Sequence, residues 1–141
     1  DADATITLGA GKDTLTIGAA GGLANITATP TTVAELTAKI VTVTDFKAAE
    51  DVLSIKAATP VVFDAAQVAL IAGQADLLAA TKKAAELAGT RKTVVFGFGT
   101  DSYIYQNDGD AAVDGGDGLV KLTGVNVNDF NSAFNGNLVV A

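Results

Sequence analysis

Residues 94–125 constrain the fold most, because two strand-like blocks flank a stretch of aspartate and glycine. The first block reads VVFGFGTDSYIY and the second reads LVKL. Both are rich in the β-branched and aromatic residues that suit a half-buried strand. The stretch between them, NDGDAAVDGGDG, can turn tightly and offer oxygen atoms, but it cannot build a core. We therefore predict a hairpin of two strands joined by an acidic loop.

The acidic loop is a candidate metal site. Its carboxylates repel one another unless a cation or water screens them, and they belong to Asp108, Asp110, Asp114 and Asp117. The spacing is not that of an EF-hand, since a count from Asp108 puts alanine and valine where a ligand and glycine belong. Two interpretations stay open, a calcium site that uses some of these residues and an exposed loop without an ion.

The residue types that are missing exclude most side-chain catalysis. The chain has 141 residues, of which 49% are apolar, so a single domain with a real core is expected. It contains no Cys, His, Met or Trp. Nucleophile pairs that need histidine, HExxH zinc sites, disulfides and soft-metal sites therefore cannot form. The residue types that are present would allow a glycosidase that uses two carboxylates. However, nothing in the sequence places two acids across an aromatic cleft. We predict a protein without enzymatic activity.

The charge balance points to hard cations. The net charge is −7, and thirteen Asp outnumber three Glu. The nine basic residues are scattered, which argues against binding of nucleic acid phosphates. Calcium is the predicted ligand, with a solvated acidic surface as the alternative. No apolar run approaches the roughly 20 residues of a membrane span, and the first residues lack the layout of a secretory signal.

Residues 1–60 read as short strands around two acidic turns. The motif GAGKDTL fits one copy of the calcium-binding G-x-G-x-D-x-U nonapeptide core, which makes Gly9, Gly11 and Asp13 candidate calcium-site residues. The alternative is an ordinary glycine turn. The second turn lies within IVTVTDFKAAEDVLSI and carries Asp45 and Asp51. These two carboxylates either ligate a metal or accept backbone N–H groups at a turn.

Residues 61–90 predict a helical insert. Residues 32–35 and 64–67 both fit a capping box, a pattern that starts helices. From residue 64 the sequence is alanine-rich up to Leu87, and apolar pairs recur every seven residues, beginning with Leu70 and Ile71. We predict one helix that covers a sheet face and ends near Gly89, with Asp76 facing water.

Several blocks resemble a known family. The block VTDFKAAEDVLSI is similar to the I-x-D-F-x-x-G-x-D-x-I-x-L element that follows the nonapeptide repeats of bacterial RTX proteins, with Ala49 in place of the usual glycine. Together with DSYIY and GLVKLTGV, the last hundred residues or so resemble the C-terminal domain of type I-secreted RTX adhesins and surface-layer (S-layer) proteins of Gram-negative bacteria.

The resemblance implies a fold and a division of the chain. The fold is expected to be mainly β, with parallel β-roll-like or sandwich sheets and one inserted helix. The expected parts are a β-roll-like part (1–60), a helical insert (61–90), a hairpin with an acidic loop (91–125) and an export-signal segment (126–141). A docked edge strand is the alternative role of the last segment.

The resemblance also implies a function. The chain would be a non-catalytic, calcium-binding module at the bacterial cell surface, exported by an ABC transporter and assembled with its own copies in a lattice. Cell-surface polysaccharide is a further candidate partner. Similar tails follow serralysin-type proteases and secreted lipases, so the export domain of an RTX hydrolase or adhesin remains the alternative.

Overall fold

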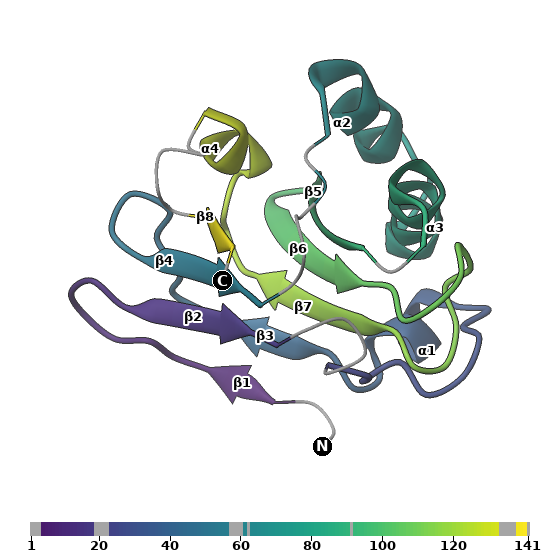
Figure 1. Cartoon of the computed structure of the whole chain (residues 1–141), viewed down its shortest axis with the longest axis horizontal. Helices are drawn as coiled ribbons and strands as arrows, with labels where there is room; N and C mark the ends of the chain where they lie inside the picture. Colours follow the sequence, from purple (N-terminus) through teal and green to yellow (C-terminus); the bar gives the residue numbers. More distant parts are fainter. Residues whose placement is uncertain are drawn as a thin grey trace.

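The computed structural model describes residues 4–18, 23–56, 61, 63–90, 92–132 and 138–140. Two β-sheets and four helices make up this part of the chain (Figure 1). The larger sheet has five strands, in the spatial order β1 (Thr5–Ile6), β3 (Val41–Val43), β7 (Gly118–Leu122), β6 (Asp101–Gln106) and β5 (Thr93–Phe98). The smaller sheet has three, in the order β2 (Thr14–Ile17), β4 (Val52–Ile55) and β8 (Leu138–Val140). The mainly β prediction is confirmed at this level.

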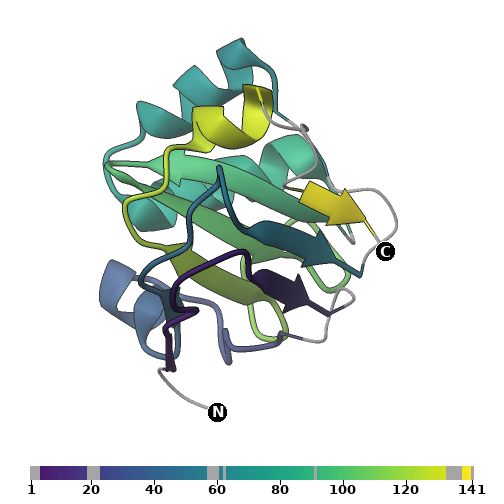
Figure 2. The same cartoon turned by 90° about the vertical axis from the view of Figure 1, so that its left-hand side faces the viewer.

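Two successive coils of the chain pass from the larger sheet to the smaller one. We call residues 5–17 coil 1, which contains β1 and β2, and residues 41–55 coil 2, which contains β3 and β4. β1 pairs in parallel with β3, and β2 pairs in parallel with β4. β7 and β8 extend both sheets in the same direction, because each pairs in parallel with a strand of coil 2. Figure 2 shows β2, β4 and β8 side by side.

The predicted hairpin is wrong in its strand count. The block VVFGFGTDSYIY forms two antiparallel strands, β5 and β6, instead of one, and β7 is the third strand. The chain reverses at Gly99 and Thr100, where Gly99 has φ +64°, a backbone conformation that glycine adopts without strain. The reversal places Phe96 opposite Tyr103, and their rings stack with centroids 5.5 Å apart.

Side chains on the larger sheet alternate between two hydrophobic cores. Along β6, Tyr103 and Tyr105 belong to a core shared with the helices, whereas Ile104 belongs to a core shared with the smaller sheet. This second core also contains Leu53 and Ile55 of β4. Because a strand points successive side chains to opposite faces, one strand serves both cores. The result is three layers, with the smaller sheet, the larger sheet and the helices in that order (Figure 1).

The single predicted helix is in fact two, α2 (Ala65–Ala72) and α3 (Leu77–Ala88). Gly73 ends α2, and Asp76 starts α3 by accepting a 2.8 Å hydrogen bond from the backbone N–H of Ala79. Asp76 is exposed to water as predicted, and its side chain is also the N-cap of α3. The break also leaves Leu70 off the buried stripe, and 54% of its surface is exposed.

Local helix signals are otherwise confirmed. Thr32 and Glu35 form a capping box that starts α1 (Val33–Thr37), and Asp64 and Gln67 form the one that starts α2. Helices α2 and α3 both pack on β5, so the insert covers a sheet face as predicted.

The segment 126–141 contributes α4 (Val127–Ser132) and β8. Leu138 pairs with Leu53 and Val140 with Ile55, so the predicted edge strand is confirmed. Residues 133–137 and 141 of the predicted export segment lie outside the described residues.

Candidate metal site in the β6–β7 loop

The loop between β6 and β7 is clamped against a segment distant in sequence. The backbone N–H of Ile26 donates to Asp117 O at 3.0 Å, and the N–H of Gly116 donates to Ile26 O at 2.9 Å. A Cβ at Gly115 would lie 3.0 Å from Thr27 O, which explains the need for glycine there. The loop therefore has a defined shape, although its sequence offers few apolar contacts.

Asp117 is the centre of the loop. Only 1% of its surface is exposed. Its Oδ1 accepts the backbone N–H of Asp108 at 2.9 Å, and its Oδ2 accepts the N–H of Asp114 at 3.0 Å. One carboxylate thus ties both halves of the loop together.

Tyr105 connects this carboxylate to the core. Its hydroxyl lies 2.6 Å from Asp117 Oδ2 and 3.2 Å from Ala112 O. A hydroxyl has one proton, so we assign the donated bond to the shorter contact with the charged acceptor. The side-chain amide of Asn107 donates to the Tyr105 oxygen at 3.3 Å and completes the arrangement.

Three of the four loop aspartates come together. Asp108, Asp114 and Asp117 each offer a carboxylate oxygen, and these oxygens lie within 4.8 Å of one another. Asp108 and Asp114 are half-buried, whereas Asp117 is buried. Asp110 is not part of this group, because it is exposed and accepts the backbone N–H of Ala112 at 2.7 Å.

The electrostatics of the cluster favour a cation. Desolvation raises the pKa of Asp114, and the negative charges of Asp110 and Asp108 raise it further. Burial also raises the pKa of Asp117, although the hydrogen bond from Tyr105 opposes this effect. A divalent cation between the carboxylates would remove the repulsion that raises the pKa of Asp114.

The donor set suits a hard ion. Three carboxylates supply only oxygen atoms, and Ca²⁺ takes six to eight such ligands with flexible geometry. Asp117 already accepts three hydrogen bonds, so Asp108 and Asp114 have more free lone pairs for an ion. Among the described residues, this arrangement is the one group of three or more acidic side chains compact enough to hold a metal.

The first predicted turn contains Gly9, Gly11 and Asp13. The two glycines have φ values of +100° and +111°, backbone conformations that glycine adopts without strain. Asp13 lies directly before β2, and its Oδ2 is buried without a hydrogen-bond partner. Among the described residues, Asp13 belongs to no group of three or more acidic side chains that could hold a metal ion.

Asp45 and Asp51 lie in the turn of coil 2 and accept backbone hydrogen bonds. Both oxygens of Asp45 are used, by the N–H groups of Leu8 and Gly9 at 2.8 Å each. These bonds lower the pKa of Asp45. Asp51 accepts from the N–H groups of Asp13 and Lys47, at 3.0 and 2.8 Å. Of the two interpretations offered by the sequence, the turn-capping one describes these contacts, and the metal-ligand one stays a prediction.

Two residues of the site were missed by sequence reasoning. Tyr105 was assigned only to a strand, and its position two residues before the Asn107–Asp108 pair that starts the loop was the available signal. Asn25 holds the start of β7, since it accepts from Leu119 N at 2.8 Å and donates to Leu119 O at 2.8 Å. Nothing near Asn25 in the sequence indicates a partner 94 residues away.

No protein-family model and no curated protein matches the chain.

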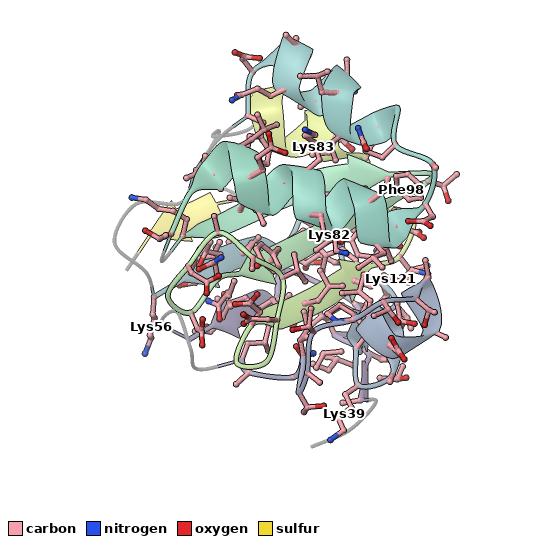
Figure 3. The ribbon with its side chains drawn as sticks, turned by 90° about the vertical axis from the view of Figure 1, so that its right-hand side faces the viewer. Lys39, Lys56, Lys82, Lys83, Phe98 and Lys121 are labelled. Atoms are coloured by element: carbon pink, nitrogen blue, oxygen red, sulfur yellow. The ribbon has the colours of Figure 1, made fainter. Side chains whose placement is uncertain are left out.

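In the described part of the chain, none of the helices has the length and apolar character needed to cross a membrane. Figure 3 shows the labelled lysines on different parts of the molecule, with Lys82 and Lys83 on α3 and Lys121 on β7.

Proposed function

We propose that the chain is a non-catalytic, calcium-binding module of a bacterial S-layer protein. The observation that carries the calcium part is the cluster of Asp108, Asp114 and Asp117. Extracellular calcium is millimolar, so a weak site made of a few carboxylates and waters would be filled after export. The ion would fix the β6–β7 loop, which the Tyr105 hydroxyl already ties to the core.

The parallel coils support the relation to RTX proteins. Coils 1 and 2 stack in register, and each places an aspartate directly before its second strand. We infer that they are β-roll-like turns and that coil 1 retains the glycine geometry of a calcium-binding repeat. Assembly in a lattice of identical copies, and contact with cell-surface polysaccharide, are parts of the same proposal.

Calcium titration tests the proposal. Isothermal titration of the metal-free chain should give binding in the micromolar to millimolar range, with weaker binding of Mg²⁺, which demands stricter geometry. Thermal melts in EGTA and in millimolar calcium should differ by several degrees. Asp114→Asn should abolish this difference. Asp110→Asn is the matched control and should preserve it, because Asp110 lies outside the cluster. Equal melts of the unmodified chain in EGTA and calcium would contradict the proposal.

Export is tested separately. A reporter fused upstream of residues 1–141 should leave a Gram-negative cell that carries a type I exporter and stay inside one that lacks it. A reporter fused to residues 1–125 should stay inside both cells. Retention of the fusion to residues 1–141 in the exporter-bearing cell would contradict the export role. It would not contradict the proposal of calcium binding.

A further inference from the structure

A cavity lies at the end of the hairpin of β5 and β6, and we call it the hairpin cavity. Its volume is about 490 Å³, within the range of roughly 300–1,000 Å³ that small-molecule sites have. It is lined by α2, the hairpin turn, the connection from β7 to α4, and the start of α4. Figures 1 and 2 show α2 and α4 at the same end of the molecule.

Part of the lining is apolar and closely packed. A Cβ at Gly97 would lie 2.7 Å from Val127 Cγ1, so glycine is needed for α4 to lie this close to β5. Val127 is buried, as is Val125 in the connection before it. Val68 of α2 and Phe98 of β5 also line the cavity and are only half-buried. The cavity therefore offers a ligand an apolar surface that includes one aromatic ring.

Asp101 supplies hydrogen-bond acceptors in a fixed position. Its Oδ1 accepts the backbone N–H of Gly124 at 2.8 Å, and its Oδ2 lies 3.1 Å from Lys121 Nζ. These two contacts hold the carboxylate in place, although 17% of the side chain is exposed. Each carboxylate oxygen has a further lone pair, which can accept a hydrogen bond from a ligand hydroxyl.

Asn126 supplies hydrogen-bond donors from another part of the lining. Its Oδ1 accepts the backbone N–H of Asn128 at 2.9 Å, which orients the side-chain amide. Within the described residues, its Nδ2 makes no hydrogen bond, and the residue is exposed. Two N–H donors are therefore left for a ligand.

The charge of the lining excludes several classes of ligand. Asp101 is the one charged residue among those that line the cavity. An anion would meet this carboxylate without a cation in the lining to bind it, and a divalent cation would find one carboxylate that Lys121 already pairs with. A wholly apolar ligand would bury Asp101 and Asn126 without partners. The ligand that fits is neutral and has both hydroxyl groups and apolar C–H surface.

We propose that the hairpin cavity binds a neutral saccharide of about one or two sugar rings. The hydroxyl groups would donate to Asp101 and accept from Nδ2 of Asn126, while the C–H face of a ring packs on Phe98. The inference rests on the proposed function, since it places the contact with cell-surface polysaccharide in this cavity. It needs no calcium, because β6 begins at Asp101 beside the cavity and ends at Gln106, next to the acidic loop.

NMR titration of the isotope-labelled chain in EGTA tests the proposal. The probes are the methyl glycosides of glucose, galactose, mannose and N-acetylglucosamine, each added up to about 50 mM. At least one should cause saturable shifts of backbone amides at Gly99, Asp101, Gly124 and Asn126, with a Kd in the millimolar range. Sorbitol is the control ligand and should cause no saturable shifts, because it has hydroxyl groups but no ring face.

Variants of the lining test where the saccharide binds. Asn126→Asp keeps an oxygen for the N–H of Asn128 but removes both donors, so it should weaken binding about threefold to tenfold. Ala72→Phe should abolish binding, because Ala72 is exposed and lines the cavity. Ala66→Phe is the matched control on α2 and should bind as the unmodified chain does, since Ala66 is exposed outside the lining. Unchanged amide shifts in β3 and β4 show that each variant is folded.

The absence of saturable shifts with all four glycosides would overturn the inference. Shifts confined to other surfaces, or binding that Ala72→Phe leaves unchanged, would also overturn it. If calcium still raises the melting temperature in these cases, the calcium part of the proposed function stands without the saccharide site. Conversely, saccharide binding by a chain that melts equally in EGTA and calcium would support the cavity and contradict the calcium part.

Discussion

The Tyr105 hydroxyl donates a 2.6 Å hydrogen bond to the buried Asp117 carboxylate, which joins the hydrophobic core to the acidic loop. Desolvation and this bond raise the pKa of Tyr105, so the phenol stays protonated and keeps donating at any ordinary pH. The loop is therefore shaped by a partner from the preceding strand and not by its glycines alone.

Tyr105→Phe should destabilise the protein by about 2 kcal/mol, because a buried carboxylate loses a charge-assisted hydrogen bond. Urea unfolding in EGTA measures this loss. Tyr103→Phe is the matched control on the same strand and should change the stability by less than about 0.5 kcal/mol. Equal losses for the two variants would show that the Tyr105 hydroxyl has no special role.

Asp114 should make stability depend on pH in an unusual direction. Its pKa is raised in the folded state, so its favourable contribution is complete below the pKa of free aspartate, about 3.9, and is lost as the pH rises through the folded pKa. In EGTA, Asp114→Asn should therefore stabilise the chain at pH 7, and the gain should vanish below pH ~3.5.

Asp45 should show the opposite dependence. Its pKa is lowered by the N–H groups of Leu8 and Gly9, so its contribution is present above the pKa of free aspartate and is lost as the pH falls through the folded pKa. Asp45→Asn should therefore destabilise the chain at pH 7 and matter less in acid. A gain in stability for this variant at pH 7 would contradict the turn-capping role.

The helix starts and the strands of coils 1 and 2 could be predicted from the sequence, because they depend on residues that are close together in the chain. The capping boxes at Thr32 and Asp64 involve residues three apart, so the sequence pattern contains the whole interaction. The positions of the strands in coils 1 and 2 also follow from local alternation.

Contacts between distant residues could not be predicted in the same way. Asp45 was recognised as a turn residue, but its partners Leu8 and Gly9 lie in another coil. The pairing of Leu53 with Leu138 likewise depends on the packing of whole sheets. Within the helical insert, one continuous helix was predicted, whereas Gly73 ends α2 and the N-cap at Asp76 starts α3.

Gly97→Ala should destabilise the chain by about 1–3 kcal/mol through overpacking. A Cβ at Gly97 would lie 2.7 Å from Val127 Cγ1, so α4 would have to move away from β5. Gly109→Ala is the control, because a Cβ there meets nothing within 4 Å. Urea unfolding of the two variants gives the comparison, and equal stabilities would contradict close packing of α4 on the sheet.

Deleting residues 138–141 should destabilise the chain by about 1–3 kcal/mol, since β4 loses its neighbour β8. Urea unfolding of the deletion measures the loss, and deletion of residue 141 alone serves as the control. An unchanged stability would show that β8 adds little to the smaller sheet. The result also decides whether a secretion defect of the deletion reflects a lost signal or a lost fold.

The pairing of β8 with β4 has a consequence for biosynthesis. Leu53 leaves the ribosome long before Leu138, so the smaller sheet cannot be completed until the last strand has been made. Until then, Leu53 and Ile55 lie in a layer that lacks one of its three strands. Of the two sheets, the smaller one is therefore the later to be completed.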